Sequence, residues 1–128
     1  SCGASSVWNF DTETGTLYIS GTGAMEDYAY EADVPWHHHK NDIVKVSVSE
    51  GITHVGDNAF RRLENLLSVK LPTSLETIGD KTFAYCYTLR EISIPNTVKA
   101  IGESAFYYCK AITDVTLPSA LTVVEKDC

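Results

Sequence analysis

A repeat with a constant period of 23 residues is the feature of this chain that most limits its fold. Residues 66–89 align with residues 89–112 column by column, and most columns keep one residue type. The aligned columns are Leu66/Leu89/Ile112, Val69/Ile92/Val115, Leu71/Ile94/Leu117, Pro72/Pro95/Pro118, Leu75/Val98/Leu121, Ile78/Ile101/Val124, Gly56/Gly79/Gly102, Phe60/Phe83/Phe106 and Cys86/Cys109. A period in the twenties is typical of a solenoid, in which each repeat covers the apolar faces of its neighbours.

The beginning of the chain does not carry the repeat. Two runs of alternating apolar and polar residues, 7–10 and 16–19, flank a turn sequence that ends at Gly15, which predicts a β-hairpin. The predicted buried face of this hairpin carries Trp8, Phe10, Leu17 and Ile19. Because a solenoid needs a dissimilar unit over its first repeat, we divide the chain into an N-terminal capping region, residues 1–42, and repeats at residues 43–128, three full and one partial.

Within each repeat, a strand, a turn, a second short extended segment and a glycine follow one another. The first strand alternates apolar and polar residues, at 44–48, 68–71, 91–94 and 114–117. After the glycine, an acidic residue suits a helix N-terminus, and apolar residues three positions apart suit one helix face. We therefore expect helices over residues 58–66, 81–89 and 104–112. The predicted fold class is an α/β solenoid, a right-handed superhelix of about 23-residue repeats.

The four cysteines show no C-x-x-C spacing of a zinc or redox site. Cys86 and Cys109 share a repeat column within segments expected to be helical. Packed helices lie about 8–10 Å apart, whereas a disulfide spans roughly 4.4–6.8 Å between Cα atoms. We therefore expect buried free thiols, with a disulfide as the less favoured alternative. Cys2 and Cys128 lie at opposite ends of the predicted stack and should not pair within one molecule.

The fourth repeat is incomplete. Glu125 stands in the glycine column, and Cys128 ends the chain before a phenylalanine position is reached. We expect that more protein follows in the parent molecule or that a partner covers this exposed end. The absence of an initiator Met and of a basic-then-apolar leader fits a mature or excised fragment.

The net charge disfavours nucleic acids and anionic membranes as partners. The formal net charge is −7, whereas nucleic acids and anionic membranes both require a basic footprint. No apolar run approaches the roughly 20 residues of a membrane span. With 44% apolar and 21% charged residues, the composition is that of a soluble globular domain. We therefore expect neither a nucleic-acid partner nor a membrane span.

Three consecutive histidines, residues 37–39, suggest a metal site at first sight, and Glu31, Asp33 and His54 could add ligands. Three successive side chains cannot converge on one ion in a helix or a strand. We therefore favour a solvated loop, with a partner contact and metal binding as the alternatives. No nucleophile has a base placed beside it in the sequence pattern. We expect no enzyme activity, no metal site and no cofactor.

The repeat consensus, L-x-x-V/I-x-L/I-P-x-x-L/V-x-x-I-G-x-x-x-F-x-x-C-x-x-L, closely resembles the BspA-type leucine-rich repeat. The beginning of the chain resembles the β-hairpin cap found before such repeats in bacterial surface proteins. The residues that carry this second resemblance are Cys2, Gly3, Trp8, Phe10, Gly15, Leu17, Ile19, Ser20, Gly21, Gly23, Met25, Pro35 and Trp36. The resemblance implies a secreted or cell-surface location and adhesion to host proteins or other cells.

Two surfaces are candidates for binding. The strand residues predicted to face solvent form a polar ladder that includes Lys45, Lys70, Glu91 and Asp114. On the opposite, predicted helical side, Tyr85 and Tyr108 share a column with Arg62, and Tyr107 lies alongside. Tyr and Arg are enriched at interaction hot spots. The alternative is that these rings lie flat and merely shield the core.

The sequence therefore favours a non-enzymatic protein-binding or adhesion module of a secreted or surface-exposed bacterial protein. The expected partner is a protein, with a host extracellular or cell-surface protein as one candidate, and a glycan is the alternative partner. The alternative is a structural spacer that carries another functional domain, or a solenoid that self-associates through its C-terminal repeat.

Overall fold

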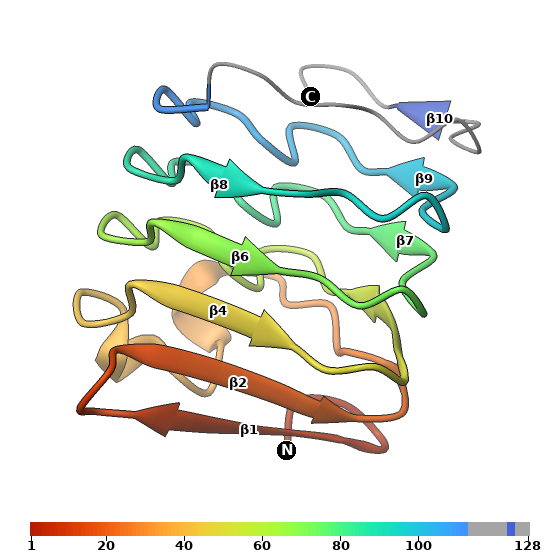
Figure 1. Cartoon of the computed structure of the whole chain (residues 1–128), viewed down its shortest axis with the longest axis horizontal. Coiled ribbons are helices and arrows are strands. Elements are labelled where there is room, and N and C mark those ends of the chain that lie inside the picture. The colour runs from red at the N-terminus through yellow and green to blue at the C-terminus, as the bar shows by residue number, and fades with distance from the viewer. Residues whose placement is uncertain (113–122, 125–128) are drawn as a thin grey trace.

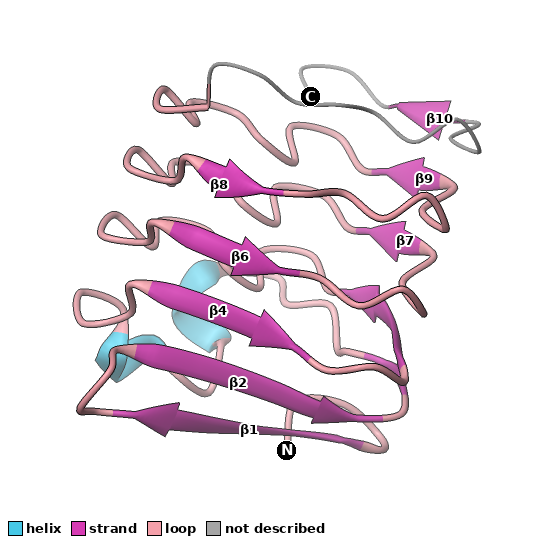
Figure 2. Cartoon of the chain, viewed as in Figure 1, coloured by secondary structure: helices cyan, strands magenta, loops and turns pink. Residues whose placement is uncertain are grey.

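The computed structural model describes residues 1–112 and 123–124, which form two sheets of short strands stacked along one axis (Figure 1). The first sheet has the order β1 (Ser6–Asp11), β2 (Thr16–Gly21), β4 (Lys45–Val48), β6 (Ser68–Lys70) and β8 (Glu91–Ile92). The second sheet runs from β3 (Gly23–Ala24) through β5 (Ile52–Val55), β7 (Thr77–Ile78) and β9 (Ala100–Ile101) to β10 (Val123–Val124). Turns and loops make up most of the remaining chain, as Figure 2 shows.

Parallel pairing between successive repeats joins residues that are 23 positions apart. In the first sheet, Val46 lies opposite Val69, and Val69 lies opposite Ile92. In the second sheet, His54 lies opposite Thr77. Residues that share a column of the sequence repeat are thus neighbours in space, so each repeat covers the apolar side chains of the next.

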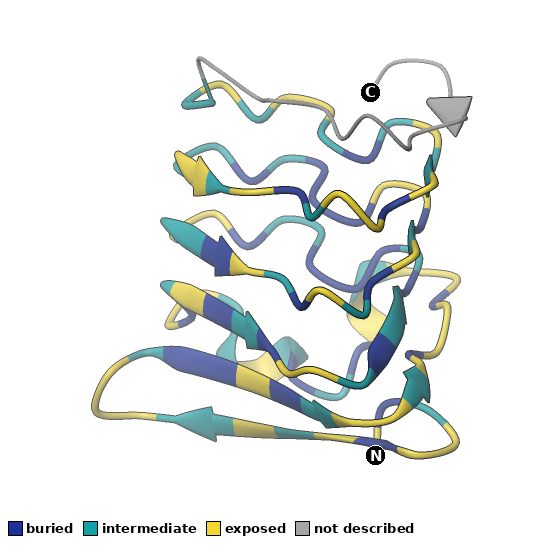
Figure 3. Ribbon diagram, turned by 45° about the vertical axis from the view of Figure 1, so that its right-hand side comes forward, coloured by how far each residue is buried: buried dark blue, intermediate teal, exposed yellow. Residues whose placement is uncertain are grey.

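Alternation along the strands separates the core from the solvent-facing side of the first sheet. In β4, Val46 and Val48 are buried, whereas Lys45 is exposed and Ser47 is half-buried. Figure 3 shows the same alternation of buried and exposed residues along the strands of this sheet. Because successive side chains of a strand point to opposite faces, every second residue remains available for contacts with other molecules.

A column of stacked aromatic rings runs through the core. Phe60 stacks on Phe83 with a ring-centroid distance of 5.5 Å, and Phe83 stacks on Phe106 at 5.3 Å. Trp36 continues the column at 5.8 Å from Phe60 and donates a hydrogen bond from Nε1 to the carbonyl of Ala59, at 3.0 Å. Trp36, Phe60 and Phe83 are fully buried, so this column ties the irregular N-terminal segment to the repeats.

The expected helices over residues 58–66, 81–89 and 104–112 are wrong. These segments are successive turns, and no α-helix occurs in the part of the chain that the structure describes. Non-glycine residues with left-handed backbone conformation recur four positions apart, for example Lys81 with φ 55° and Tyr85 with φ 61°. The described fold is therefore a solenoid of sheets and turns, and the α/β class predicted from the sequence is corrected.

Hydrogen bonds between repeats explain why turns replace helices. The backbone N–H groups of Asn58, Phe60 and Arg62 donate to carbonyls of the next repeat, at 3.0, 2.9 and 2.9 Å. In a helix, the same N–H groups would donate four residues back along their own segment. A left-handed backbone conformation is unfavourable by about 1–2 kcal/mol for each non-glycine residue. The hydrogen bonds between repeats offset this cost, because they give the backbone N–H groups of the turns carbonyl partners.

The N-terminal hairpin extends the first sheet. Its antiparallel register places Trp8 opposite Ile19 and Phe10 opposite Leu17, and β2 then pairs with β4 in parallel. Leu17 and Ile19 are fully buried, while Trp8 and Phe10 are partly buried against the core. The hairpin thus lies beside the first repeat, and its role as a cap remains a prediction.

The segment between hairpin and repeats contains two short 3₁₀ helices, η1 (Glu31–Asp33) and η2 (His37–His39). Trp36 precedes η2 and is fully buried. The ring of Trp8 meets the ring of Trp36 edge to face, with centroids 6.1 Å apart. The irregular sequence therefore folds around a single buried tryptophan.

The three cysteines in the described part of the chain, Cys2, Cys86 and Cys109, are free. The thiol of Cys86 donates to the carbonyl of Phe60 at 3.1 Å, and the thiol of Cys109 donates to the carbonyl of Phe83 at 3.0 Å. Burial raises the pKa of Cys86 well above its usual value and that of Cys109 to about 11. Cys86 is buried as expected, whereas Cys109 is only partly buried, and Cys128 lies outside the described residues.

Candidate functional site

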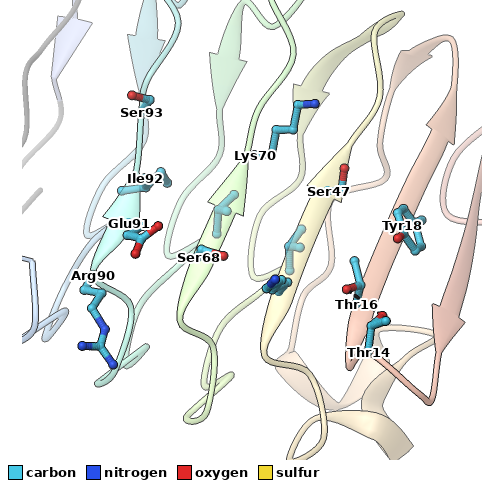
Figure 4. A pocket seen from close by; sticks show the side chains of 13 residues that line it. Thr14, Thr16, Tyr18, Ser47, Ser68, Lys70, Arg90, Glu91, Ile92 and Ser93 are labelled. Carbon is cyan, nitrogen blue, oxygen red and sulfur yellow. Dashed lines mark hydrogen bonds between the residues drawn. The ribbon is translucent and has the colours of Figure 1, made fainter.

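A shallow groove crosses the solvent-facing side of strands β2, β4, β6 and β8. It has a volume of about 770 Å³ and is shown from close by in Figure 4. We call it the strand-face groove, lined by Thr14, Thr16, Tyr18, Lys45, Val46, Ser47, Ser68, Val69, Lys70, Arg90, Glu91, Ile92 and Ser93. Hydroxyl groups and the charged side chains of Lys45, Lys70 and Glu91 project into it, because these positions alternate with the inward-facing Val46, Val69 and Ile92. Arg90 directly precedes β8 and adds a third cation.

The strand-face groove contains three of the four strand residues predicted as binding candidates. Lys45, Lys70 and Glu91 line it together, and each is exposed. The fourth, Asp114, lies outside the described residues. Sequence reasoning missed Arg90, although it is the one charged residue in a column that also holds Val44 and Leu67.

Sequence reasoning also missed Tyr18 of the hairpin, which lines the same groove and is 42% exposed. Its neighbours Leu17 and Ile19 are buried, so the alternation of the hairpin strand places Tyr18 on the opposite face. The parallel pairing of Tyr18 with Ser47 then brings the hairpin into the candidate site.

The turn side brings together the other four predicted residues. Arg62 lies over the ring of Tyr85, with 4.3 Å between the guanidinium carbon and the ring centroid. Tyr85 stacks on Tyr108 at 5.6 Å, and Tyr107 meets Tyr108 edge to face at 4.5 Å. Lys110 lies 5.4 Å from the centroid of Tyr108. We call these five residues the tyrosine surface.

Exposure and charge distinguish the members of the tyrosine surface. Tyr107 and Tyr108 are 40% and 48% exposed, so these rings do not lie fully covered on the core. Arg62 also forms an ion pair with Glu31, with 3.2 Å between Nε and Oε2. The arrangement presents aromatic rings and cations together, which is a composition enriched at protein interfaces.

One group of side chains in the described residues could hold a metal ion, and it is not the histidine run. The ligand atoms of Asp27, His54 and Asp57 lie within 4.8 Å of one another. His54 Nε2 already lies 2.8 Å from Asp27 Oδ1, and His54 Nδ1 lies 2.7 Å from Thr77 Oγ1. The group is thus joined internally by hydrogen bonds that also connect the N-terminal segment to the first two repeats.

The electrostatics of this group differ between its two carboxylates. Partial burial opposes ionisation of Asp27, but hydrogen bonds from His54 and from the N–H of Asp57 lower its pKa below the usual value. Burial raises the pKa of Asp57, and the nearby carboxylates of Asp27 and Asp80 add to this effect. The pKa values of the two carboxyls are therefore shifted in opposite directions.

The histidine run does not join this group. His39 stacks on Phe10 with ring centroids 4.6 Å apart, and His38 is exposed. Of the ligands considered from the sequence, only His54 belongs to the candidate metal group. The consecutive histidines form η2, a single 3₁₀ turn, whose side chains project in different directions.

A sequence model of one family matches most of the chain. The model described as "BspA type Leucine rich repeat region (6 copies)" matches residues 37–128. The chain belongs to the BspA-type leucine-rich-repeat family. The resemblance stated from the repeat columns is therefore confirmed. No curated protein matches this BspA-type repeat protein.

Solved structures of other leucine-rich-repeat proteins have the same fold as this BspA-type chain. One from Eubacterium ventriosum gives a TM-score of 0.77 at 25% identity, over 97% of this chain and 38% of that one. The T. pallidum leucine-rich-repeat protein gives 0.67 at 21%, over 92% and 60%. A leucine-rich cell surface protein from Faecalibacterium prausnitzii gives 0.57 at 19%, over 96% and 44%. This chain thus spans between 38% and 60% of those proteins.

Leucine-rich-repeat proteins are generally protein-interaction modules and are typically not enzymes, which fits the predicted class of function at this coarse level. No helix in the described residues is long and apolar enough to cross a membrane.

Proposed function

We propose that this chain is a non-enzymatic protein-binding module of a secreted or cell-surface bacterial protein, and that it mediates adhesion through the strand-face groove. In this proposal the repeats form a right-handed superhelix of 23-residue units, and residues 1–42 cap its first repeat. Membership in the BspA-type family supports a role in protein interaction. The likeness to a structure described as a leucine-rich cell surface protein supports the location.

The strand-face groove is the observation that carries the proposal. Its exposed residues, such as Lys45, Lys70 and Arg90, make no contribution to the apolar core. Lys45 on β4 and Lys70 on β6 stand on strands that pair with both neighbours, and Arg90 directly precedes β8, which pairs with β6. A rigid, preformed surface loses little conformational entropy on binding, which favours affinity.

The tyrosine surface is a second candidate for the same class of function. Its rings are already ordered by stacking, since Tyr85 packs between Arg62 and Tyr108. An aromatic side chain that is already ordered loses little conformational entropy on binding and can bury a large area. We place it second because each of its rings already contacts another ring or cation, whereas Lys45, Lys70 and Arg90 of the groove are exposed.

Direct binding to a panel of purified host extracellular-matrix proteins tests the proposal. Surface plasmon resonance would compare the whole chain with Ser47→Tyr and Ser93→Tyr, which fill the groove. Ser49→Tyr is the matched control, because Ser49 is exposed beside the groove but does not line it. We expect at least one protein of the panel to bind the unmodified chain and the control, and to lose affinity for both groove variants.

Two other results would redirect the assignment. Binding that survives both groove variants but is lost in Tyr85→Ala and Tyr108→Ala would place the site on the tyrosine surface. Absence of binding to every protein of the panel, together with concentration-dependent stacking in sedimentation velocity, would instead support the structural spacer or self-assembling solenoid.

A further inference from the structure

The strand-face groove has a charge opposite to that of the chain as a whole. The protein carries 17 Asp and Glu residues against 10 Lys and Arg residues. The described lining of the groove reverses this balance, with Lys45, Lys70 and Arg90 against the single carboxylate of Glu91. From this reversal we propose that the groove takes an acidic, extended segment of a protein. The inference rests on the proposed function and names the chemistry of the partner at the same groove.

The three cations of the groove are also available to a partner. None of Lys45, Lys70 and Arg90 forms an ion pair within the described part of the chain, whereas Arg61, Arg62 and Lys99 do. All three groove cations are exposed at the groove surface. Carboxylates of a bound segment would therefore meet cations that need not first break a close ion pair, although hydrogen bonds from Thr73 and then the nearby charge of Lys70 lower the pKa of the Glu50 carboxyl.

The spacing of the strands suits an extended polypeptide. Neighbouring strands lie about 4.8 Å apart, so the distance from β2 to β8 is roughly 14 Å. An extended chain rises about 3.3 Å per residue, so about five residues cross the groove. Lys45 on β4, Lys70 on β6 and Arg90 beside β8 stand on successive strands along this path. A segment with several Asp or Glu residues can therefore pair with more than one of them.

The remaining lining favours a peptide over a uniform polyanion. Ser47, Ser68 and Ser93 bring hydroxyl groups that both donate and accept hydrogen bonds. A peptide backbone offers both an N–H donor and a carbonyl acceptor at nearly every residue. The carboxylate of Glu91 would repel an unbroken row of sulfates or phosphates, but it can accept a hydrogen bond from a backbone N–H.

Fluorescence anisotropy with fluorescein-labelled hexaglutamate tests this chemistry on the whole 128-residue chain. We expect hexaglutamate to bind and the equally long hexaglutamine to bind far more weakly. Lys45→Gln, Lys70→Gln and Arg90→Gln should each weaken hexaglutamate binding about two- to fivefold, the range of an exposed ion pair. Binding should also fall as salt rises from 0.05 M to 1 M, because the screening length shortens to about 3 Å.

Matched controls distinguish the effect of the groove cations from the effect of a change in net charge. Lys40→Gln and Lys81→Gln each remove one positive charge outside the groove and outside the tyrosine surface, and each should leave hexaglutamate affinity within a factor of about 1.5. Equal losses in both sets would overturn the proposal, and so would equal binding of hexaglutamine. Tighter binding of a sulfated oligosaccharide that displaces hexaglutamate would overturn it in favour of a glycan.

Failure of this inference can be told apart from failure of the proposed function. A matrix protein that is blocked by Ser47→Tyr but is not displaced by hexaglutamate would refute the acidic segment and leave the groove as a protein-binding site. If neither hexaglutamate nor any matrix protein binds, both proposals are wrong. Displacement of a bound matrix protein by hexaglutamate supports both.

Discussion

The carboxylate of Asp57 accepts a hydrogen bond from the backbone N–H of Asp80, one repeat further along, with 2.7 Å between Oδ1 and N. The same contact recurs between Asp80 and Glu103 at 2.8 Å, and Asp27 makes it to the N–H of Asp57 at 2.8 Å. A ladder of carboxylates therefore bonds each repeat to the next. Asp57 and Asp80 each follow a glycine, a position that suggested a helix N-terminus, and each instead accepts a hydrogen bond from the following repeat.

Acid should weaken the fold through Asp27. Its pKa is lowered in the folded state, so the unfolded chain binds more protons as the pH falls around and below the usual value of 3.8. The stabilisation by Asp27 is therefore present above that pH and lost as the pH falls through the lower, folded pKa. We expect Asp27→Asn to flatten the loss of stability between about pH 5 and pH 2, measured by urea unfolding at each pH.

Asp57 provides the opposite control. Its pKa is raised in the folded state, so its protonation favours folding as the pH falls. Asp57→Asn keeps an oxygen that can accept the bond from Asp80, but it removes this favourable protonation. The loss of stability in acid should therefore become steeper in Asp57→Asn. Equal pH profiles for the two variants would contradict the opposite electrostatics of the pair.

Close stacking of the repeats at the glycine column should make Gly79 intolerant of a side chain. A Cβ atom at this position would meet the side-chain oxygen of Asp57 and would lie 2.7 Å from the backbone nitrogen of Asp57. Overpacking of this kind typically destabilises by about 1–3 kcal/mol, and rigid backbone cannot move aside easily. We expect Gly79→Ala to lower the free energy of unfolding by at least that range in urea denaturation.

Gly23 is the comparison for this substitution. Its φ of +82° strains any side chain, but a Cβ there would meet nothing within 4 Å. Gly23→Ala should therefore lower the free energy of unfolding only by the conformational penalty of about 1–2 kcal/mol. A larger loss of stability for Gly23→Ala than for Gly79→Ala would contradict the claim that close packing between repeats requires glycine at position 79.

The aromatic column predicts a large effect of Phe83→Ala. Phe83 is fully buried and stacks on Phe60 and on Phe106. Truncation of a buried phenylalanine costs about 3–5 kcal/mol, which is a large part of a small domain's stability of roughly 5–15 kcal/mol. We expect a much lower melting temperature, whereas Phe106→Ala should have a smaller effect because Phe106 is only partly buried. An unchanged melting temperature for Phe83→Ala would contradict the placement of Phe83 in the core.

Left-handed backbone at the turns can be tested at Lys81, which is exposed and has a φ of 55°. Glycine adopts this conformation without the steric penalty of a side chain. Lys81→Gly should therefore be neutral or raise the free energy of unfolding by up to about 1 kcal/mol. In an α-helix the same change would lower it by about 1 kcal/mol. Lys40, which has a φ of −55°, is the control and should lose stability on replacement by glycine.

The structural core follows from repeated columns that are visible in the sequence. Val46, Val69 and Phe83 are buried where the period of 23 residues places them, because parallel stacking brings equal positions together. The helices were predicted wrongly because apolar residues three positions apart, such as Phe60 and Leu63, fit both a helix face and successive turns. Which structure forms depends on hydrogen bonds to the next repeat, and no local pattern encodes those.

The candidate site was only partly visible for a related reason. Alternation along the strand placed Lys45, Lys70 and Glu91 on one solvent-facing side, and the structure brings them into one groove. Arg90 comes just before the alternating pair of β8, in a column that is otherwise apolar, so it was not counted with the strand face. Tyr18 belongs to the hairpin, and its place beside Ser47 depends on the parallel pairing of β2 with β4.

Site-specific photo-crosslinking tests the central claim, that the strand-face groove binds a protein partner, most directly. A benzophenone side chain would replace Ser49 beside the groove in one variant and Tyr107 on the tyrosine surface in another. Each variant would be incubated with the matrix protein that binds the unmodified chain. Ser49 is exposed and does not line the groove, so a large side chain there leaves the groove open, and Tyr107 lies on the turn side. We predict a crosslinked product from position 49 that hexaglutamate suppresses, and little product from position 107. Crosslinking at position 107 with none at position 49 would contradict the claim.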